Sequence, residues 1–259
     1  MVHARDLFDL TGKVAIITGG GRGLGREIAL GYAEMGADVV LCSRRVENCE
    51  QVAEEVRALG RQALPLACNV AEPEDVRRVV DESLKTFGHI DILVNNSGAS
   101  WGAPAVDMPL DAWRKVMETN VTGTFLMSQA VGRHMIERGQ GGRIVNIASV
   151  AGLVGSPPEV LDAVGYSASK GAIISLTRDL AVKWARYNIL VNAIAPGFFP
   201  TKMSRVILER NGDTILRGTP LGRFGEEGEL KGAAIFLASP ASSYVTGHVL
   251  TVDGGSSVM

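Results

Sequence analysis

VAIITGGGRGLGREIALGYAEMGADVVLC, residues 14–42, is the stretch of sequence that decides the fold. It holds two apolar runs, 14–18 and 38–42, separated by a glycine-rich turn and an amphipathic helical pattern. Runs without strict polar alternation are typical of parallel strands that helices cover on both faces. The stretch therefore predicts a strand, a helix and a second, parallel strand.

Similar runs recur along the rest of the chain, each followed by a turn signal or a helical pattern. They are QALPLAC at 62–68, DILVN at 91–95, RIVNIA at 143–148, ILVNAIA at 189–195 and HVLTVD at 248–253. Seven strands alternating with helices predict a single α/β domain over residues 1–259, with a doubly wound parallel sheet. Ligands of such sheets bind beyond the carboxyl ends of the strands, so the loops there should converge on one cleft.

Composition excludes several classes of partner. The 26 basic and 28 acidic residues give a net charge of −2 and are mixed along the chain, which predicts no nucleic-acid partner and no membrane partner. The three cysteines are odd in number and lack metal-ligand spacing, so we expect no metal site and no disulfide framework. The first residues carry charges and no apolar segment, which favours a cytoplasmic protein.

The glycine-rich turn predicts a dinucleotide site. Glycines allow backbone amides to approach a pyrophosphate, and the following helix offers unpaired N–H groups at its N-terminus. The spacing is G-x-x-x-G-x-G, at Gly19, Gly23 and Gly25, and not the G-x-G-x-x-G of the standard fingerprint. A tight connection between strand and helix is the structural alternative. The position after a first strand favours a Rossmann-type cofactor half at about 10–148, followed by a catalytic and substrate half at about 149–259.

The end of the second strand indicates which dinucleotide is bound. An acidic residue there would bind the ribose 2′-hydroxyl of NAD, whereas arginine accommodates the 2′-phosphate of NADP. The residues present are Ser43, Arg44 and Arg45, and Arg22 in the glycine turn could reach the same phosphate. A solvated surface cluster is the alternative. Agreement between two separate loops favours NADP(H).

Three residues point to carbonyl chemistry. Ser149 follows the fifth apolar run, and Tyr166 and Lys170 lie four apart, on one face of the predicted helix. An ammonium group near the phenol, together with an oxidised nicotinamide, should lower the pKa of Tyr166 toward working pH. Tyr166 would then protonate a carbonyl oxygen while Ser149 donates a hydrogen bond to it. Asn120, polar amid apolar neighbours, could hold a water that links Lys170 to solvent.

Each of these residues has a structural alternative when it is taken alone: a surface helix contact, an N-cap, or a satisfied buried amide. Together, behind a nucleotide loop, they resemble the catalytic tetrad of the short-chain dehydrogenase/reductase family over essentially the whole chain. TGGGRGLG at 18–25, NNSG at 95–98 and PGFFPT at 196–201 resemble further motifs of that family. The resemblance implies that Lys170 also binds the nicotinamide ribose, that hydride leaves the pro-S face, and that the protein is a homotetramer or homodimer.

The predicted cofactor residues come from these motifs and loops. They are Thr18, Gly19, Gly21, Arg22, Gly23, Leu24, Gly25, Ser43, Arg44, Arg45, Asn69, Val70, Asn96, Gly98, Tyr166, Lys170, Pro196, Gly197, Phe199 and Thr201. The family commonly has Asp-Val where this chain has Asn69 and Val70, and the Asn69 amide could still accept from the adenine amino group. The separation of 17 positions between Ser149 and Tyr166 is longer than is usual for the family, because of the stretch 155–165.

The predicted substrate side is mainly apolar. It comprises Ser100, Trp101, Leu153, Phe198 and Met203. Such a surface suits an acyl chain or a hydrophobic ketone, although these residues could instead pack a mobile lid. The chain resembles β-ketoacyl-acyl carrier protein reductases most closely, and NADPH-dependent reduction of a 3-oxoacyl thioester, or of a similar small-molecule or carrier-bound ketone, is the expected function. Arg133 matches one carrier-docking arginine, whereas the second position holds Tyr187, next to Arg186.

Two other functions remain open. Resemblance to gluconate 5-dehydrogenases implies a sugar-acid dehydrogenase, in which Lys202 or Arg205 could hold the substrate carboxylate. A non-catalytic, dinucleotide-binding redox sensor is the third reading. The complete tetrad argues against a sensor, which would have little need for both Tyr166 and Lys170.

Overall fold

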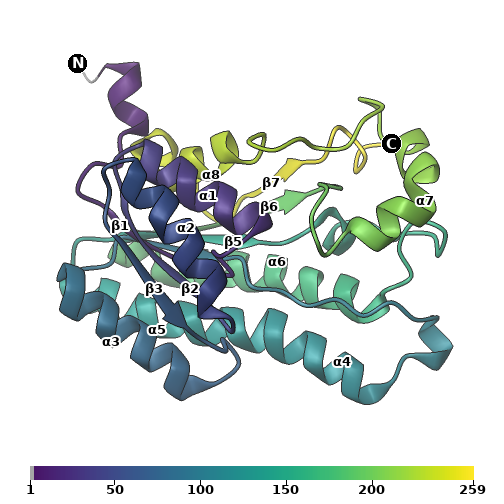
Figure 1. Cartoon of the computed structure of the whole chain (residues 1–259), viewed down its shortest axis with the longest axis horizontal. Coiled ribbons are helices and arrows are strands. Elements are labelled where there is room, and N and C mark those ends of the chain that lie inside the picture. Colours follow the sequence, from purple (N-terminus) through teal and green to yellow (C-terminus); the bar gives the residue numbers. More distant parts are fainter. Residues whose placement is uncertain (1–2) are drawn as a thin grey trace.

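The computed structural model describes residues 3–259 and contains one sheet of seven strands (Figure 1). The strands are β1 (Val14–Thr18), β2 (Asp38–Ser43), β3 (Ala63–Ala67), β4 (Ile92–Asn95), β5 (Gly142–Ile147), β6 (Ile189–Pro196) and β7 (Val249–Val252). Their order is β3-β2-β1-β4-β5-β6-β7, and every neighbouring pair is parallel. The predicted doubly wound parallel sheet is confirmed, with its change of direction between β1 and β4.

Helices cover both faces of this sheet (Figure 1). They are α1 (Gly23–Glu34), α2 (Val46–Ala58), α3 (Pro73–Phe87), α4 (Leu110–Met117), α5 (Gly123–Arg138), α6 (Val164–Trp184), α7 (Arg205–Arg217) and α8 (Lys231–Ala238). Helices α1, α2 and α8 share one core cluster with the sheet, and α3, α5 and α6 share the other. The chain therefore folds as three layers in a single domain.

The first strand shows why the sequence lacks polar alternation. All five residues of β1 are buried. Ala15 and Ile17 pack into the cluster under α1, whereas Val14 and Ile16 pack into the cluster under α3 and α5. Successive side chains of a strand point to opposite faces, so a strand between two helical layers needs apolar residues at every position.

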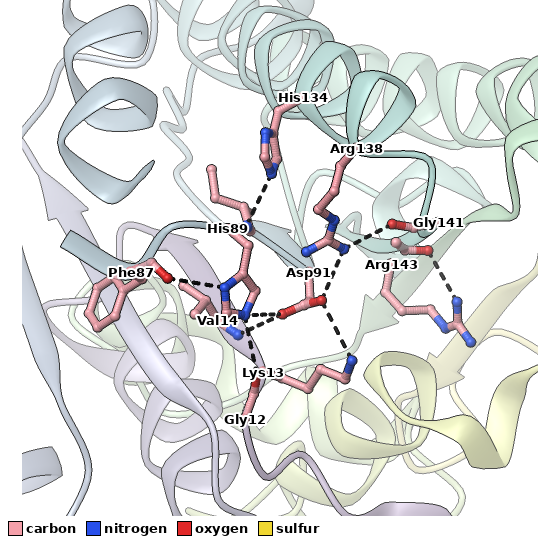
Figure 2. A network of polar contacts seen from close by, with 12 residues as sticks. Gly12, Lys13, Val14, Phe87, His89, Asp91, His134, Arg138, Gly141 and Arg143 are labelled. Carbon is pink, nitrogen blue, oxygen red and sulfur yellow. Dashed lines mark hydrogen bonds and ion pairs between the residues drawn. The ribbon is translucent and has the colours of Figure 1, made fainter. Parts of the chain in front are cut away.

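A polar network around Asp91 closes the amino edge of the sheet (Figure 2). One carboxylate oxygen of Asp91 accepts from the backbone N–H of Val14 at 3.0 Å and lies 3.2 Å from Nε2 of His89. The other lies 3.0 Å from the guanidinium of Arg138 and 3.6 Å from Nζ of Lys13. The network joins β1, β4 and the end of α5, on the side away from the loops that follow the strands.

Two features are absent from residues 3–259. No helix there is long and apolar enough to cross a membrane. His, Cys, Asp and Glu side chains in the same range form no group that could hold a metal ion.

Candidate active site

The turn between β1 and α1 has a backbone that only glycine allows. Gly19 and Gly23 have positive φ values of 65° and 53°. A Cβ atom on Gly25 would lie 2.3 Å from the carbonyl oxygen of Gly19 and 2.5 Å from Nδ2 of Asn96. The turn is therefore bare backbone packed against the start of α1, and it fits a pyrophosphate at the helix N-terminus.

Asn96 and Thr18 hold this turn in shape from the neighbouring strand. The side-chain amide of Asn96 donates to the carbonyl oxygens of Thr18, at 2.9 Å, and Gly19, at 3.1 Å. The hydroxyl of Thr18 accepts from the backbone N–H groups of Asn96 and Ser97, both at 3.0 Å. Both residues were predicted to bind the cofactor, and the structure shows that their side chains first fix the loop.

The glycine turn lies directly against the loop after β2. A Cβ atom on Gly21 would be 2.8 Å from Cβ of Asn48, in the first turn of α2. Arg22 follows Gly21 in the chain, while Arg44 and Arg45 immediately precede α2. The two loops that were expected to act on one phosphate thus meet in the folded chain.

The arginine side chains of these loops are free of acidic partners. Arg22, Arg44 and Arg45 are exposed, and none forms an ion pair within residues 3–259. The last residue of β2 is Ser43, so the strand end carries no carboxylate. The hydroxyl of Ser43 donates to the carbonyl oxygen of Arg45 at 2.7 Å. The loop is therefore suited to a phosphate group.

Several predicted cofactor residues have their side chains in the core. Val70 is 5% exposed and packs against Gly123, where an added Cβ would approach Val70 Cγ2 to 2.5 Å. Phe199 is buried and contacts Gly225. Leu24 is partly buried against the cluster under α1. These residues can face a dinucleotide only through their backbones.

The predicted segment 196–201 returns to the glycine turn. Gly197 donates its backbone N–H to the carbonyl oxygen of Val252 at 3.0 Å, which ties the segment to β7. A Cβ atom on Gly23 would lie 3.6 Å from Cγ2 of Thr201. The turn after β6 and the turn after β1 therefore border the same space. Asn69 lies after β3, where its Oδ1 accepts from the backbone N–H of Ala71 at 3.3 Å.

The three residues predicted for carbonyl chemistry come together. Ser149 follows β5, and its hydroxyl lies close enough to the phenol of Tyr166 to lower the pKa of that phenol. Tyr166 and Lys170 lie one turn apart on α6, with Nζ of Lys170 5.5 Å from the centre of the Tyr166 ring. Lys170 is buried and donates to the carbonyl oxygen of Ile147 at 2.6 Å. The sheet edge supplies the serine and the helix supplies the other two residues.

Burial sets the acid–base properties of this group. Desolvation lowers the pKa of Lys170 to about 8, because no carboxylate compensates for it. Desolvation also raises the pKa of Tyr166, and the hydrogen bond from Ser149 opposes that shift in part. The lowered pKa expected for Tyr166 depended on an oxidised nicotinamide as well as on the ammonium group; without the cofactor, loss of water raises the pKa of the phenol.

Asn120 occupies a π-helical turn, Glu118–Thr122, inserted between α4 and α5. Such turns are frequent at functional sites. The side chain is fully buried, and its amide bonds both backbone groups of Ala99 and the hydroxyl of Ser169. A Cβ on Gly98 would lie 3.6 Å from Asn120 Oδ1 and 4.0 Å from Lys170 Nζ, so both groups lie close to that glycine. The predicted water link to Lys170 stays a prediction.

The predicted substrate residues are accessible. Trp101 is 46% exposed, Met203 is 55% exposed, Leu153 and Ser100 are exposed, and Phe198 is half-buried. The loop that carries Ser100 and Trp101 is fixed at Ala103. This residue pairs with Ala163 and donates its backbone N–H to the carbonyl oxygen of Asp162 at 3.0 Å. The unusual stretch 155–165 therefore pairs with the loop after β4.

Sequence reasoning missed Ser169, which is fully buried beside Asn120. Its position gave a signal, since it directly precedes Lys170 and lies three residues after Tyr166, on the inner side of the same helix. The hydrogen bonds of the Ala99 backbone to Asn120 had no signal in the sequence, because every residue type has the same backbone groups.

Comparisons with known proteins agree with this geometry. A family model described as short chain dehydrogenase matches residues 13–212. The chain therefore belongs to the short-chain dehydrogenase family, and it is an oxidoreductase that acts on CH–OH and C=O groups. The resemblance seen in the sequence is confirmed at this level.

Similar proteins include sugar-acid enzymes and a thioester reductase. The chain is 40% identical over 252 residues to a 5-keto-D-gluconate 5-reductase of Escherichia coli (strain K12), which covers 96% of this chain and 97% of that protein. It is 39% identical over 246 residues to a 3-oxoacyl-acyl-carrier-protein reductase of Thermotoga maritima, covering 95% and 98%. A solved gluconate 5-dehydrogenase from Burkholderia cenocepacia J2315, in complex with NADP and tartrate, matches with a TM-score of 0.93 and 43% identity over 99% of this chain and 100% of that one.

Proposed function

We propose that this protein interconverts a keto sugar acid and its hydroxy acid with NADP(H), as a dehydrogenase of the gluconate 5-dehydrogenase type. The observation that carries the reaction is the arrangement of Ser149 and Tyr166 beside the buried Lys170, whose Nζ lies 5.5 Å from the centre of the Tyr166 ring. The substrate class differs from the 3-oxoacyl thioester expected from the sequence. Sugar-acid enzymes match over nearly the full chain at 40% and 43% identity, and the thioester reductase matches at 39%.

The residues at the site divide the work of carbonyl reduction. Bound NADPH supplies the hydride that adds to the carbonyl carbon. Tyr166 gives its phenolic proton to the carbonyl oxygen, so that C=O becomes CH–OH. The oxygen of Ser149 accepts from the backbone N–H of Ala151 at 3.2 Å, and its one proton turns from the Tyr166 phenol to the carbonyl oxygen when the ketone is bound. Lys170, whose pKa of about 8 lies near neutral pH, can return a proton to the phenol.

The cofactor residues fit a phosphorylated dinucleotide. The pyrophosphate would lie on the backbone of the glycine turn, at the N-terminus of α1. Arg22 and Arg44 would hold the 2′-phosphate, since both are exposed, unpaired within residues 3–259, and carried by loops in contact. Preference for NADP(H) over NAD(H) is part of the proposal.

The charges around the site favour a carboxylate substrate over a carrier-bound one. Lys202 is exposed and forms no ion pair in the described part of the chain, whereas Arg205 lies 3.6 Å from Glu209. Lys202 is therefore the better candidate to hold a substrate carboxylate. On the side proposed for carrier docking, Arg186 stacks on the ring of Tyr187, with its guanidinium carbon 4.8 Å from the ring centre. The substitution of tyrosine for the second docking arginine weakens the thioester alternative.

A panel of ketones tests the substrate class. NADPH consumption is followed with 5-ketogluconate, acetoacetyl thioesters, a diketone and an aromatic ketone. We expect the keto acid to have the highest kcat/KM, and we expect Lys202→Met to raise its KM about tenfold while the KM of the uncharged diketone is unchanged. Lys183→Met is the matched control, because Lys183 is exposed but paired with Asp179. Turnover confined to the thioester would contradict the proposal.

A further inference from the structure

Ser169 is a buried hydroxyl with two defined hydrogen-bond partners. It lies on α6 between Tyr166 and Lys170 and has no exposed surface. Its Oγ donates to the carbonyl oxygen of Tyr166 at 2.7 Å and accepts from Nδ2 of Asn120 at 2.8 Å. A serine inside a helix usually bonds only a carbonyl of the preceding turn. The bond from Asn120 is the additional feature.

Asn120 passes this connection to the loop after β4. Its Oδ1 accepts from the backbone N–H of Ala99 at 2.7 Å, and its Nδ2 donates to the carbonyl oxygen of Ala99 at 2.9 Å. Ala99 is followed directly by Ser100 and Trp101, which are exposed. One side chain therefore holds both backbone groups of the residue from which this loop starts.

The far end of the loop is held separately. The bridge between Ala103 and Ala163 fixes it to the segment that leads into α6. Residues 99–103 are thus held at one end by Asn120 and at the other by this bridge. Both contacts adjoin α6, because Asn120 bonds Ser169 and Ala163 directly precedes the helix.

A second network on the same helix has the same chemistry but a different destination. Nδ2 of Asn146 donates to the hydroxyl of Thr177 at 2.9 Å, and Thr177 donates to the carbonyl oxygen of Ile173 at 2.8 Å. Asn146 then accepts from Asn95 at 2.9 Å, inside the sheet. This network joins α6 to the core and reaches no loop, so it is a matched comparison for Ser169.

We propose that Ser169 is a positioning residue for the ketone site: through Asn120 it holds the loop 99–103 in a fixed relation to the helix that carries Tyr166 and Lys170. The proposal rests on the proposed function in that this loop borders the site where the ketone binds. When the hydroxyl is removed, the Asn120 side chain loses one of its three hydrogen bonds, and its amide is held against Ala99 less firmly. The loop should then move more freely, while the dinucleotide loops keep their own contacts.

The test uses Ser169→Ala and Thr177→Val in the full chain. Ser169→Ala should speed hydrogen exchange of the backbone N–H groups in peptides that cover residues 97–103, measured by mass spectrometry. It should also raise the KM for the fastest ketone of the panel about fivefold, with kcat changed less than about twofold and the KM for NADPH unchanged. Thr177→Val removes an equivalent buried hydroxyl, and we expect it to leave exchange at 97–103 and the ketone KM as in the wild type.

Three results would overturn the inference: unchanged exchange at 97–103 in Ser169→Ala, faster exchange with an unchanged ketone KM, or equal effects of Thr177→Val. A wild type that reduces no ketone contradicts the proposed function alone, and hydrogen exchange then decides whether Ser169 holds the loop.

Discussion

Two polar clusters lie at opposite edges of the same sheet, and they differ in whether their buried charge has a partner of opposite charge. At the amino edge, Asp91 faces Lys13, His89 and Arg138, so a nearly buried carboxylate is matched by several cationic or hydrogen-bonding groups (Figure 2). At the carboxyl edge, Lys170 is 4% exposed, and no carboxylate lies within ion-pair distance among residues 3–259. Burial accordingly lowers its pKa to about 8.

The difference separates a structural cluster from a chemical one. Paired charges offset the cost of leaving water, and breaking such a pair strands a charge. An unpaired buried ammonium keeps that cost, and its pKa moves into the range in which proton transfer is useful. A substitution at the amino edge should therefore act on stability alone, and one at the carboxyl edge on catalysis first.

The largest expected effect is that of Tyr166→Phe on catalysis. Removing the phenolic proton donor should lower kcat by about a thousandfold, with thermal unfolding nearly unchanged. Tyr32→Phe is the matched control, because Tyr32 is also buried and its hydroxyl donates to the carbonyl oxygen of Ala234 at 3.1 Å, far from the site. We expect Tyr32→Phe to cost stability and leave kcat intact. Steady-state kinetics and calorimetry on both variants measure this, and full activity of Tyr166→Phe would show that Tyr166 is not the proton donor.

Next in size is the loss of stability in Asp91→Asn. Arg138, 13% exposed in its side chain, would lose its carboxylate, and we expect the free energy of unfolding to fall by about 3 kcal/mol. Asp179→Asn breaks the exposed ion pair with Lys183 and should cost close to nothing. Urea unfolding of both variants, with kcat/KM measured in parallel, makes the comparison. A fall in kcat/KM without a fall in stability would show that the amino edge is not purely structural.

Lys170→Met should raise the free energy of unfolding at neutral pH, whereas Asp91→Asn lowers it. The folded pKa of about 8 lies below the ordinary 10.5, so the folded chain disfavours the charged form, and this cost is fully present below pH 8. It disappears between about pH 8 and 10.5 as the unfolded chain also loses its proton. We expect Lys170→Met to be inactive yet more stable at pH 7 by roughly 1–3 kcal/mol, since the lost bond to Ile147 offsets part of the gain. The difference should shrink above pH 10; a less stable variant at pH 7 would contradict this account.

The class of the fold and its seven strands could be predicted because their signals are local. Each strand has apolar residues on both faces, and parallel strands with helical connections permit few topologies. The meeting of Ser149, Tyr166 and Lys170 also followed from helical spacing and from convergence of loops at one edge. These predictions depend on residue type and order alone.

The rest of the site depends on contacts across the fold. The π-helical turn around Asn120 and its bonds to the Ala99 backbone have no periodic signature. The raised pKa of Tyr166 in the cofactor-free chain follows from burial by distant segments, which the neighbouring residues in the sequence do not indicate. Residue spacing likewise could not tell that the side chains of Val70 and Phe199 belong to the core. Burial and backbone contacts become visible only when the chain is folded.

The smallest expected effect extends the comparison to the surface, where Arg44 is a cation without an acidic partner in the described chain. If such cations mark function here too, Arg44→Ala should raise the KM for NADPH about tenfold and leave that for NADH unchanged, because one charged hydrogen-bonding group to the 2′-phosphate is lost. Arg57→Ala is the matched control: Arg57, on the neighbouring helix α2, is exposed but paired with Glu54, so neither cofactor KM should change. Equal effects of Arg44→Ala on NADPH and NADH would show that this arginine does not bind the 2′-phosphate, and that lack of a partner at the surface does not mark function as it does in the interior.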